Sequence, residues 1–166
     1  MSSIRMALAS LISLICFAFA VSPARAGDAN ASIPPSPIGV WATENGLSHV
    51  KIEDCGGKLC GALIWLKEPL NKERKDKIDS QNPDPSLQSR KLLGLPLLNG
   101  FVSDRDGTVW SSGTIYNPDD GKTYSCKLTM LDPKTMKVRG YIGISILGKT
   151  QIWNRVEERA NHGNSG

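Results

Sequence analysis

Short runs in which apolar and polar residues alternate follow one another along most of this chain, from about residue 38 onward. Such a period of two is typical of a β-strand with one buried face. Turn signals such as Asn45-Gly46 and Asn117-Pro118 separate the runs, and none shows a sustained 3.6-residue period. The pattern therefore predicts an all-β domain. The expected strands span residues 38–43, 48–53, 59–66, 92–102, 108–116, 123–131, 136–142 and 150–156.

Almost every link between these runs is short, which favours antiparallel pairing of neighbours, because parallel strands need a crossover of a dozen or more residues. An open meander of about eight strands would expose two long unpaired edges, whereas closure removes both. We therefore predict an up-and-down antiparallel β-barrel of about eight strands. A two-sheet sandwich is the alternative.

One link is an exception, because residues 67–91 form a long, charged and proline-rich connection. A connection of this length inside one domain is often functional. A helical turn is expected near residues 86–89, with Asp84 as its cap. The motif Asp79-x-x-Asn82-Pro83 has two interpretations: it folds over the barrel mouth and contacts a ligand, or it anchors turns through side chain to backbone hydrogen bonds.

Residues 1–26 have the features of a secretory signal peptide: Arg5, an apolar run over residues 8–21, and small residues at Ala24 and Ala26. The apolar run is shorter than the roughly 20 residues that span a bilayer. We expect cleavage near Ala26 and a periplasmic or secreted protein. The predicted organisation is then a proline-rich disordered leader over 27–37, the barrel domain over 38–157 and a flexible tail over 158–166. We expect no transmembrane segment in the mature chain.

Three cysteines remain after such cleavage, and in an exported protein they raise the question of a disulfide. Cys55 and Cys60 flank a glycine turn where a hairpin brings two strands together, so a bridge between them is predicted. Cys126 lies within an alternating strand. It is either a buried, inert thiol or the partner of one of the other two cysteines.

Composition excludes several kinds of function. Without the signal, 18 basic and 16 acidic residues leave a net charge of +2, which does not indicate nucleic-acid binding. His49 and His162 are too few for a metal site, which needs several His, Cys or carboxylate ligands grouped together, and His49 is interpreted as an ordinary strand residue. We expect no cofactor, because the sequence lacks a glycine-rich phosphate loop.

Aromatic and charged residues in the strands are the candidates for ligand contacts. Trp110 and Tyr116 are expected on one face of a strand, with hydroxyls between them, as in the wall of a pocket. The alternative is that such aromatics are core and rim residues. In each of two consecutive strands an arginine and an aromatic residue share a face: Arg139 with Tyr141, and Arg155 with Trp153. If that face points inward, the arginines need anionic partners. The candidate ligand-binding residues are Trp65, Asp79, Asn82, Trp110, Tyr116, Arg139, Tyr141 and Trp153.

Two resemblances support the barrel. Gly39-x-Trp41 resembles the start of lipocalins, where the tryptophan plugs the barrel floor beneath an arginine of the last strand; Arg155 occupies such a position. The wider pattern is similar to the domain of unknown function 2147 family, which implies an exported, lipocalin-like barrel. This resemblance rests on Gly39-Val40-Trp41, Leu59-Cys60-Gly61 with Trp65, Asp79-x-x-Asn82-Pro83, Leu93-Gly94-Leu95, Gly113-x-Ile115-Tyr116-x-Pro118, Asp120-Gly121-Lys122-x-Tyr124, Arg139-Gly140-Tyr141-x-Gly143 and Trp153-x-Arg155.

These observations favour an exported protein that binds or carries a small, apolar or amphipathic molecule. The alternative is a periplasmic protein-interaction or envelope-stress protein whose barrel is filled by its own side chains. In that case the long connection, with Asp79 and Asn82, presents a protein-binding surface. A hydrolase built on Asp79, Arg139 and Tyr141 is a third hypothesis, and no catalytic motif supports it.

Overall fold

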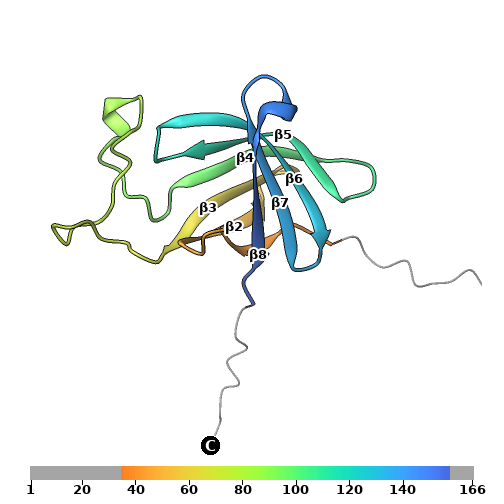
Figure 1. The fold of residues 1–166 in the computed structure, drawn as a ribbon, viewed down its shortest axis with the longest axis horizontal. Helices are drawn as coiled ribbons and strands as arrows, with labels where there is room; N and C mark the ends of the chain where they lie inside the picture. Colours follow the sequence, from red (N-terminus) through yellow and green to blue (C-terminus); the bar gives the residue numbers. More distant parts are fainter. Residues whose placement is uncertain (1–34, 158–166) are drawn as a thin grey trace, which may run out of the picture. The chain divides into compact units, whose positions relative to one another are not determined.

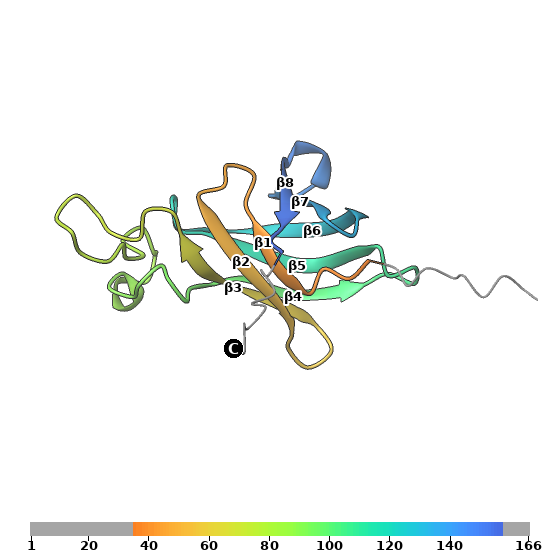
Figure 2. The ribbon, with the colours of Figure 1, turned by 90° about the horizontal axis from the view of Figure 1, so that it is seen from below.

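The alternating runs form eight antiparallel strands in the computed structural model, which describes residues 35–157. Each strand pairs with its neighbours in sequence and the last pairs with the first, so the sheet is a closed barrel (Figures 1 and 2). The predicted barrel is confirmed and the sandwich is excluded. The strands are β1 (Gly39–Ala42), β2 (Ser48–Asp54), β3 (Leu59–Leu66), β4 (Pro96–Ser103), β5 (Val109–Asn117), β6 (Lys122–Asp132), β7 (Thr135–Tyr141) and β8 (Lys149–Arg155).

Helical structure in the described residues is limited to two short 3₁₀ turns, η1 (Pro85–Leu87) and η2 (Ser145–Leu147). Asp84 caps η1 through its side chain, which accepts a hydrogen bond from the Ser86 amide. Within residues 35–157, no helix has the length and apolar character needed to cross a membrane. The predicted signal peptide, most of the predicted leader and the predicted tail lie outside the described residues.

Because consecutive strands run in opposite directions, their connections alternate between the two ends of the barrel. Residues 43–47, 67–95, 118–121 and 142–148 lie at one end, which we name the loop end. Residues 55–58, 104–108 and 133–134 make short turns at the other end, which we name the turn end. The long connection 67–95 leaves the barrel from β3 and returns to β4 (Figure 1).

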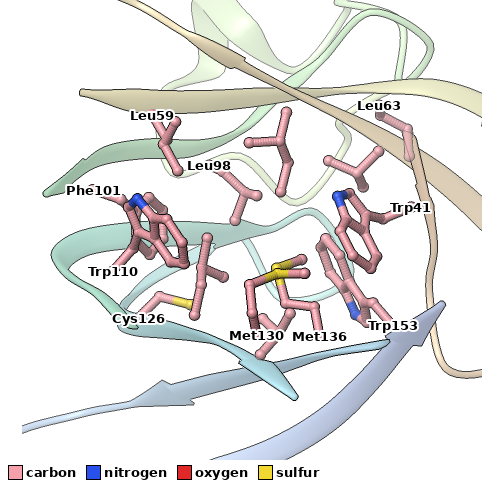
Figure 3. Packing of buried hydrophobic residues seen from close by; sticks show 14 of the residues in the cluster. Trp41, Leu59, Leu63, Leu98, Phe101, Trp110, Cys126, Met130, Met136 and Trp153 are labelled. Atoms are coloured by element: carbon pink, nitrogen blue, oxygen red, sulfur yellow. The ribbon is translucent and has the colours of Figure 1, made fainter. Parts of the chain in front are cut away.

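The barrel interior is filled by its own side chains. Trp41, Phe101 and Trp153 are almost completely buried, and they pack with aliphatic and sulfur-containing side chains from all eight strands (Figure 3). Cys126 is one of these core residues and carries a free thiol. Close packing of this kind is the main source of stability in a domain of this size.

Strand β5 departs from the predicted alternation. The register shifts between Trp110 and Gly113, and Ser112 has a φ of 62°. A bulge adds one residue and moves all later side chains to the opposite face. Trp110 therefore lies in the core, whereas Tyr116 lies on the other face, so the prediction that they share a face is wrong. The absence of a side chain at Gly113 makes room for Phe101, because a Cβ there would lie 2.4 Å from the phenyl ring.

The turn end is closed by an arginine over a tryptophan. The Arg155 guanidinium carbon lies 4.3 Å from the centre of the Trp41 ring. Arg155 also donates hydrogen bonds to the carbonyls of residues 36, 38 and 133, and the Trp41 indole donates to the Pro37 carbonyl at 2.7 Å. A cation over an indole adds to stability where both groups are shielded from water. The geometry matches the role that the lipocalin resemblance implied for this pair.

The predicted disulfide between Cys55 and Cys60 is present in the turn between β2 and β3. This bridge links the ends of two paired strands and fixes the hairpin at the turn end. Cys126 is thus left unpaired, and its burial raises the pKa of the thiol to about 12. A thiol with so high a pKa is present as the unreactive neutral form at neutral pH.

Candidate functional site

The long connection at the loop end is held together by its own backbone. Two isolated bridges pair Leu70 with Asp76 and Ile78 with Lys91, so the segment doubles back on itself before it returns to β4. The Asp79 amide donates to the Arg90 carbonyl at 3.0 Å, which brings the two halves of the connection together. This ordering places Asp79 where its side chain faces the barrel.

Asp79 is the centre of a buried polar cluster, and none of its surface is exposed. Tyr116 donates its hydroxyl to Oδ1 at 2.6 Å. Asn82 Nδ2 and Arg90 Nε each donate to Oδ2 at 2.8 Å, and Arg90 Nη2 forms an ion pair with the same oxygen at 2.8 Å. Asn82 also donates to the Tyr116 hydroxyl at 3.1 Å, so the four side chains form one connected network.

The network keeps the carboxylate charged despite its burial. Burial alone would raise the pKa of Asp79. The hydrogen bonds from Tyr116, Asn82 and Arg90 and the positive charge of Arg90 together lower it by a larger amount, so the pKa lies below the ordinary value. The pKa of Tyr116 is raised by burial, and the neighbouring Asp79 charge reinforces that shift. At neutral pH the cluster therefore holds an anionic Asp79, a neutral Tyr116 and a cationic Arg90.

The motif Asp79-x-x-Asn82-Pro83 therefore acts as an anchor rather than as an exposed ligand or partner contact. Asn82 accepts a hydrogen bond from the Asp84 amide, and its carbonyl accepts one from the Gln88 side chain at 2.9 Å. Asp79 and Asn82 are both buried in this structure, and the expectation that they contact a ligand or a protein partner stays a prediction. The expectation that this motif fixes turns agrees with the contacts.

The anchored connection rests on the β5–β6 turn. Gly121 has a φ of +68°, and a Cβ at this position would lie 1.8 Å from the Gln81 carbonyl oxygen. Glycine is therefore required at 121 for both reasons: the backbone conformation and the approach of the connection. Together with the Tyr116–Asp79 hydrogen bond, this contact ties the connection to β5 and to the turn that follows it.

A cavity of about 450 Å³ lies between the connection and the β5–β6 turn. Its apolar lining comes from Ile78, Leu92 and Pro118, and the other five lining residues are polar or charged: Asn71, Lys77, Ser80, Gln81 and Asp119. The lining is therefore a mixture of apolar and polar groups, and the volume lies within the usual range for small-molecule sites. The cavity opens at the loop end and does not enter the packed core.

A second hollow of about 290 Å³ lies at the turn end, lined by residues that include Pro37, Leu59 and Trp110. Its position beside the disulfide hairpin differs from that of the first cavity. In residues 35–157, no group of three or more His, Cys, Asp or Glu side chains is arranged to hold a metal ion.

The remaining candidate residues are dispersed. Trp110 and Trp153 are buried in the core, where they pack against other side chains, and Trp110 also lines the hollow at the turn end. Trp65 lies on the outer face of β3, 41% exposed, and stacks on the ring of His49 at 4.3 Å between centroids. The side chains expected to wall one pocket therefore lie on both faces of the sheet.

The arginine–aromatic pairs of β7 and β8 point to opposite faces. Trp153 and Arg155 face inward, whereas Arg139 lies on the outer face, because its neighbour Val138 is buried. Arg139 donates to two carbonyls of the β7–β8 loop and to Thr150, and it has no contact with Asp79 among the described hydrogen bonds. The structure thus does not assemble the residues of the hypothetical hydrolase.

Arg90 is the member of the polar cluster that sequence reasoning missed. It lies 11 residues after Asp79 and contacts it only because the connection folds back on itself. The signal that could have found it is chemical: a buried carboxylate requires a cationic partner, and Arg90 belongs to the same connection.

The chain matches a family model described as "Uncharacterized protein conserved in bacteria (DUF2147)" over residues 39–155. The chain belongs to this family. Among solved structures, it is similar to one described as "Protein HP1028 from the human pathogen Helicobacter pylori belongs to the lipocalin family". The two share 25% sequence identity with a TM-score of 0.63, over 73% of this chain and 83% of that one. A search of curated proteins finds no match. This DUF2147 protein thus has a lipocalin-like barrel, as its motifs predicted.

Proposed function

We propose that this DUF2147 protein is an exported binding protein that holds a small, partly apolar molecule at the loop end of its barrel. The observation that carries the proposal is the cavity of about 450 Å³ between the anchored connection and the β5–β6 turn. The buried Asp79 cluster holds one wall of this cavity in place before any ligand arrives. A preformed wall lowers the ordering cost of binding.

The site proposed here is outside the barrel interior. Three tryptophans occupy that interior, and large aliphatic side chains fill the space between them. A ligand of any size would have to displace these side chains, which would sacrifice the packing that stabilises the domain. The likeness to a lipocalin-family protein supports binding as a function class, and the cavity supports a different place for it.

The cavity lining indicates the chemistry of the ligand. Ile78, Leu92 and Pro118 supply apolar contact, and Asn71 and Gln81 supply hydrogen-bonding groups. Lys77 also lines the cavity, and its ammonium lies 3.7 Å from the Glu68 carboxylate, so the positive charge there is partly balanced. Asp119 in the same lining opposes an anionic ligand, so we infer an amphipathic ligand with an apolar portion and neutral polar groups.

Export is supported by two features of different kinds. Residues 1–26 carry the signal pattern, and the described domain contains the disulfide between Cys55 and Cys60. Disulfides persist in oxidising compartments such as the periplasm and the extracellular space. We therefore place the protein in one of these compartments.

Native mass spectrometry of protein purified from the periplasm of its own bacterium tests the proposal. The wild-type protein should carry additional bound mass, and Ile78→Asp, which places a charge in the cavity, should lose it. Leu70→Asp is the matched control. Leu70 lies on the same connection and is 43% exposed, close to the 45% of Ile78, but only Ile78 lines the cavity. A clean unbound mass for the wild type, or equal bound mass in Ile78→Asp, would overturn the proposal.

The filled interior also favours a second function, in which the protein acts through contacts with other proteins and binds no small molecule. Here the connection 67–95 presents its exposed residues to the partner while the Asp79 cluster holds its shape. The same purification distinguishes the two functions. If the wild-type protein carries no bound mass and crosslinks to one defined partner through this connection, the result supports the second function alone.

A further inference from the structure

The β7–β8 loop, residues 142–148, exposes four large aliphatic side chains in succession. Ile142 and Ile144 are 68% and 62% exposed, and Ile146 and Leu147 are 78% and 79% exposed. These are the highest exposures among the large apolar residues of the described chain. A contiguous exposed apolar group of this kind marks an interaction surface more often than a neutral part of the molecular surface.

The loop is held in this conformation by polar contacts with β7. Arg139 donates from Nε to the Ser145 carbonyl at 2.7 Å and from Nη2 to the Ile146 carbonyl at 3.0 Å. Its Nη1 donates to Thr150 Oγ1 at 2.6 Å, which fixes the guanidinium itself. The same contacts satisfy backbone carbonyls that would otherwise need water, which matters in an apolar medium. The four aliphatic side chains are thus displayed by a structured loop.

Gly148 shows how closely the loop folds against the strand. A Cβ at this position would lie 2.5 Å from the Gly140 carbonyl oxygen and 2.8 Å from the Tyr141 Cβ. The loop protrudes beyond the ends of β7 and β8, and both views place it apart from the long connection 67–95 (Figures 1 and 2). The loop is therefore independent of the cavity assigned above.

The strands that carry the loop are basic. Between residues 121 and 156 the sequence has seven basic residues and one acidic residue; the basic residues Lys134 and Arg155 and the acidic Asp132 lie at the turn end. Lys149 directly follows the loop, and Lys127 is the cross-strand neighbour of Arg139. None of the ion pairs in the described part of the chain involves Lys127 or Lys149.

We propose that residues 142–148 insert into the surface of an anionic phospholipid bilayer. The four aliphatic side chains enter the boundary between headgroups and acyl chains, while Lys127 and Lys149 contact the anionic headgroups. Apolar side chains next to basic ones are the combination that holds proteins at such surfaces. A second copy of this chain fits less well, because a symmetric contact through the loop would bring the same lysines together.

Vesicle flotation tests this assignment with two lipid compositions, pure phosphatidylcholine and phosphatidylcholine mixed with phosphatidylglycerol. The wild-type protein should float with the mixed vesicles, less with the neutral ones, and less again at high salt. The double variant Ile146→Ser and Leu147→Ser should bind the mixed vesicles at least about tenfold more weakly, because two aliphatic side chains are removed from the bilayer contact. All variants carry the same termini, so differences between them report the loop alone.

Two further variants complete the test. Leu131→Ser with Val102→Ser removes apolar groups that are 52% and 44% exposed at the turn end, and its binding should equal that of the wild type. Lys127→Ala with Lys149→Ala should weaken binding to the mixed vesicles by about tenfold and leave binding to neutral vesicles unchanged. Circular dichroism and thermal melts confirm that each variant is folded.

Three outcomes overturn the proposal: no flotation of the wild type, undiminished flotation of the Ile146 and Leu147 variant, or equal loss in the turn-end control. A loop variant that leaves flotation unchanged but abolishes self-association in sedimentation would assign the loop to contact between copies instead.

Discussion

Replacing Asp79 by asparagine removes the charge at the centre of the buried cluster while preserving the size of the side chain. The carboxylate accepts hydrogen bonds from Tyr116, Asn82 and Arg90, and the variant forces an amide group to face at least one of these donors. Each hydrogen bond to a charged group contributes about 1.5–3 kcal/mol, and the contributions of such neighbours do not add. Breaking a fully buried ion pair costs about 3–5 kcal/mol, but Arg90 is 35% exposed and regains water. We therefore expect a loss of about 3 kcal/mol, which corresponds to a fall in melting temperature of roughly 10 °C.

The assay is guanidinium unfolding with the disulfide intact, for wild type, Asp79→Asn and the control Asp106→Asn, whose exposed side chain has no partner among the described contacts. Because the pKa of Asp79 is lowered by folding, its contribution is fully present above the ordinary pKa and is lost as pH falls through the lowered one. The difference between wild type and Asp79→Asn should therefore shrink from neutral pH to about pH 3. Trypsin should also cleave the connection 67–95 faster in this variant. A loss below about 0.5 kcal/mol, or a difference that does not change with pH, would refute the anchoring role of the cluster.

Three further predictions concern the barrel itself. Gly113→Ala should destabilise the protein by about 1–3 kcal/mol in denaturant unfolding, because the added Cβ overlaps the Phe101 ring. The control Gly140→Ala, whose Cβ has its nearest contact at 3.5 Å, should change stability little. Equal effects of the two substitutions would contradict this account of the bulge. Cys126 should resist alkylation in the native protein and react after unfolding, as peptide mapping would show, because burial raises the pKa of its thiol to about 12; native labelling would show that this part of the core opens. Replacing both Cys55 and Cys60 by serine should lower the free energy of unfolding by about 2 kcal/mol, the value expected for so short a closed loop, and an unchanged melting temperature would argue against that contribution.

The strands could be predicted from sequence because their signals are local. Alternation and turn residues act within a few positions, so the predicted strands match the observed ones within a residue or two at most boundaries. The exception is the start of β4, where the segment from residue 92 turns at Gly94 before the strand begins at Pro96. Gly94 has a φ of 90°, which an extended strand does not allow.

The candidate site was less accessible to sequence reasoning, because it depends on strand faces and on distant contacts. The bulge at Ser112 separates Trp110 from Tyr116, and no turn or proline signals it beforehand. The hydrogen bond between Tyr116 and Asp79 joins residues 37 positions apart. The sequence pattern identified the motif around Asp79 as significant, but only the folded connection shows that its carboxylate faces the barrel and binds Arg90.

The joint between β1 and β8 is narrow: they share two residue pairs, Trp41 with Arg155 and Ala42 with Asn154, whereas β6 and β7 share seven. The Arg155 guanidinium links that joint, through hydrogen bonds, to the segments on either side of it. It follows that the first and last strands detach together, earlier than the middle of the sheet, and that their amides exchange with solvent sooner. Molecules in which these two strands have detached expose two unpaired sheet edges. At high concentration, such molecules exchange their terminal strands with neighbouring copies.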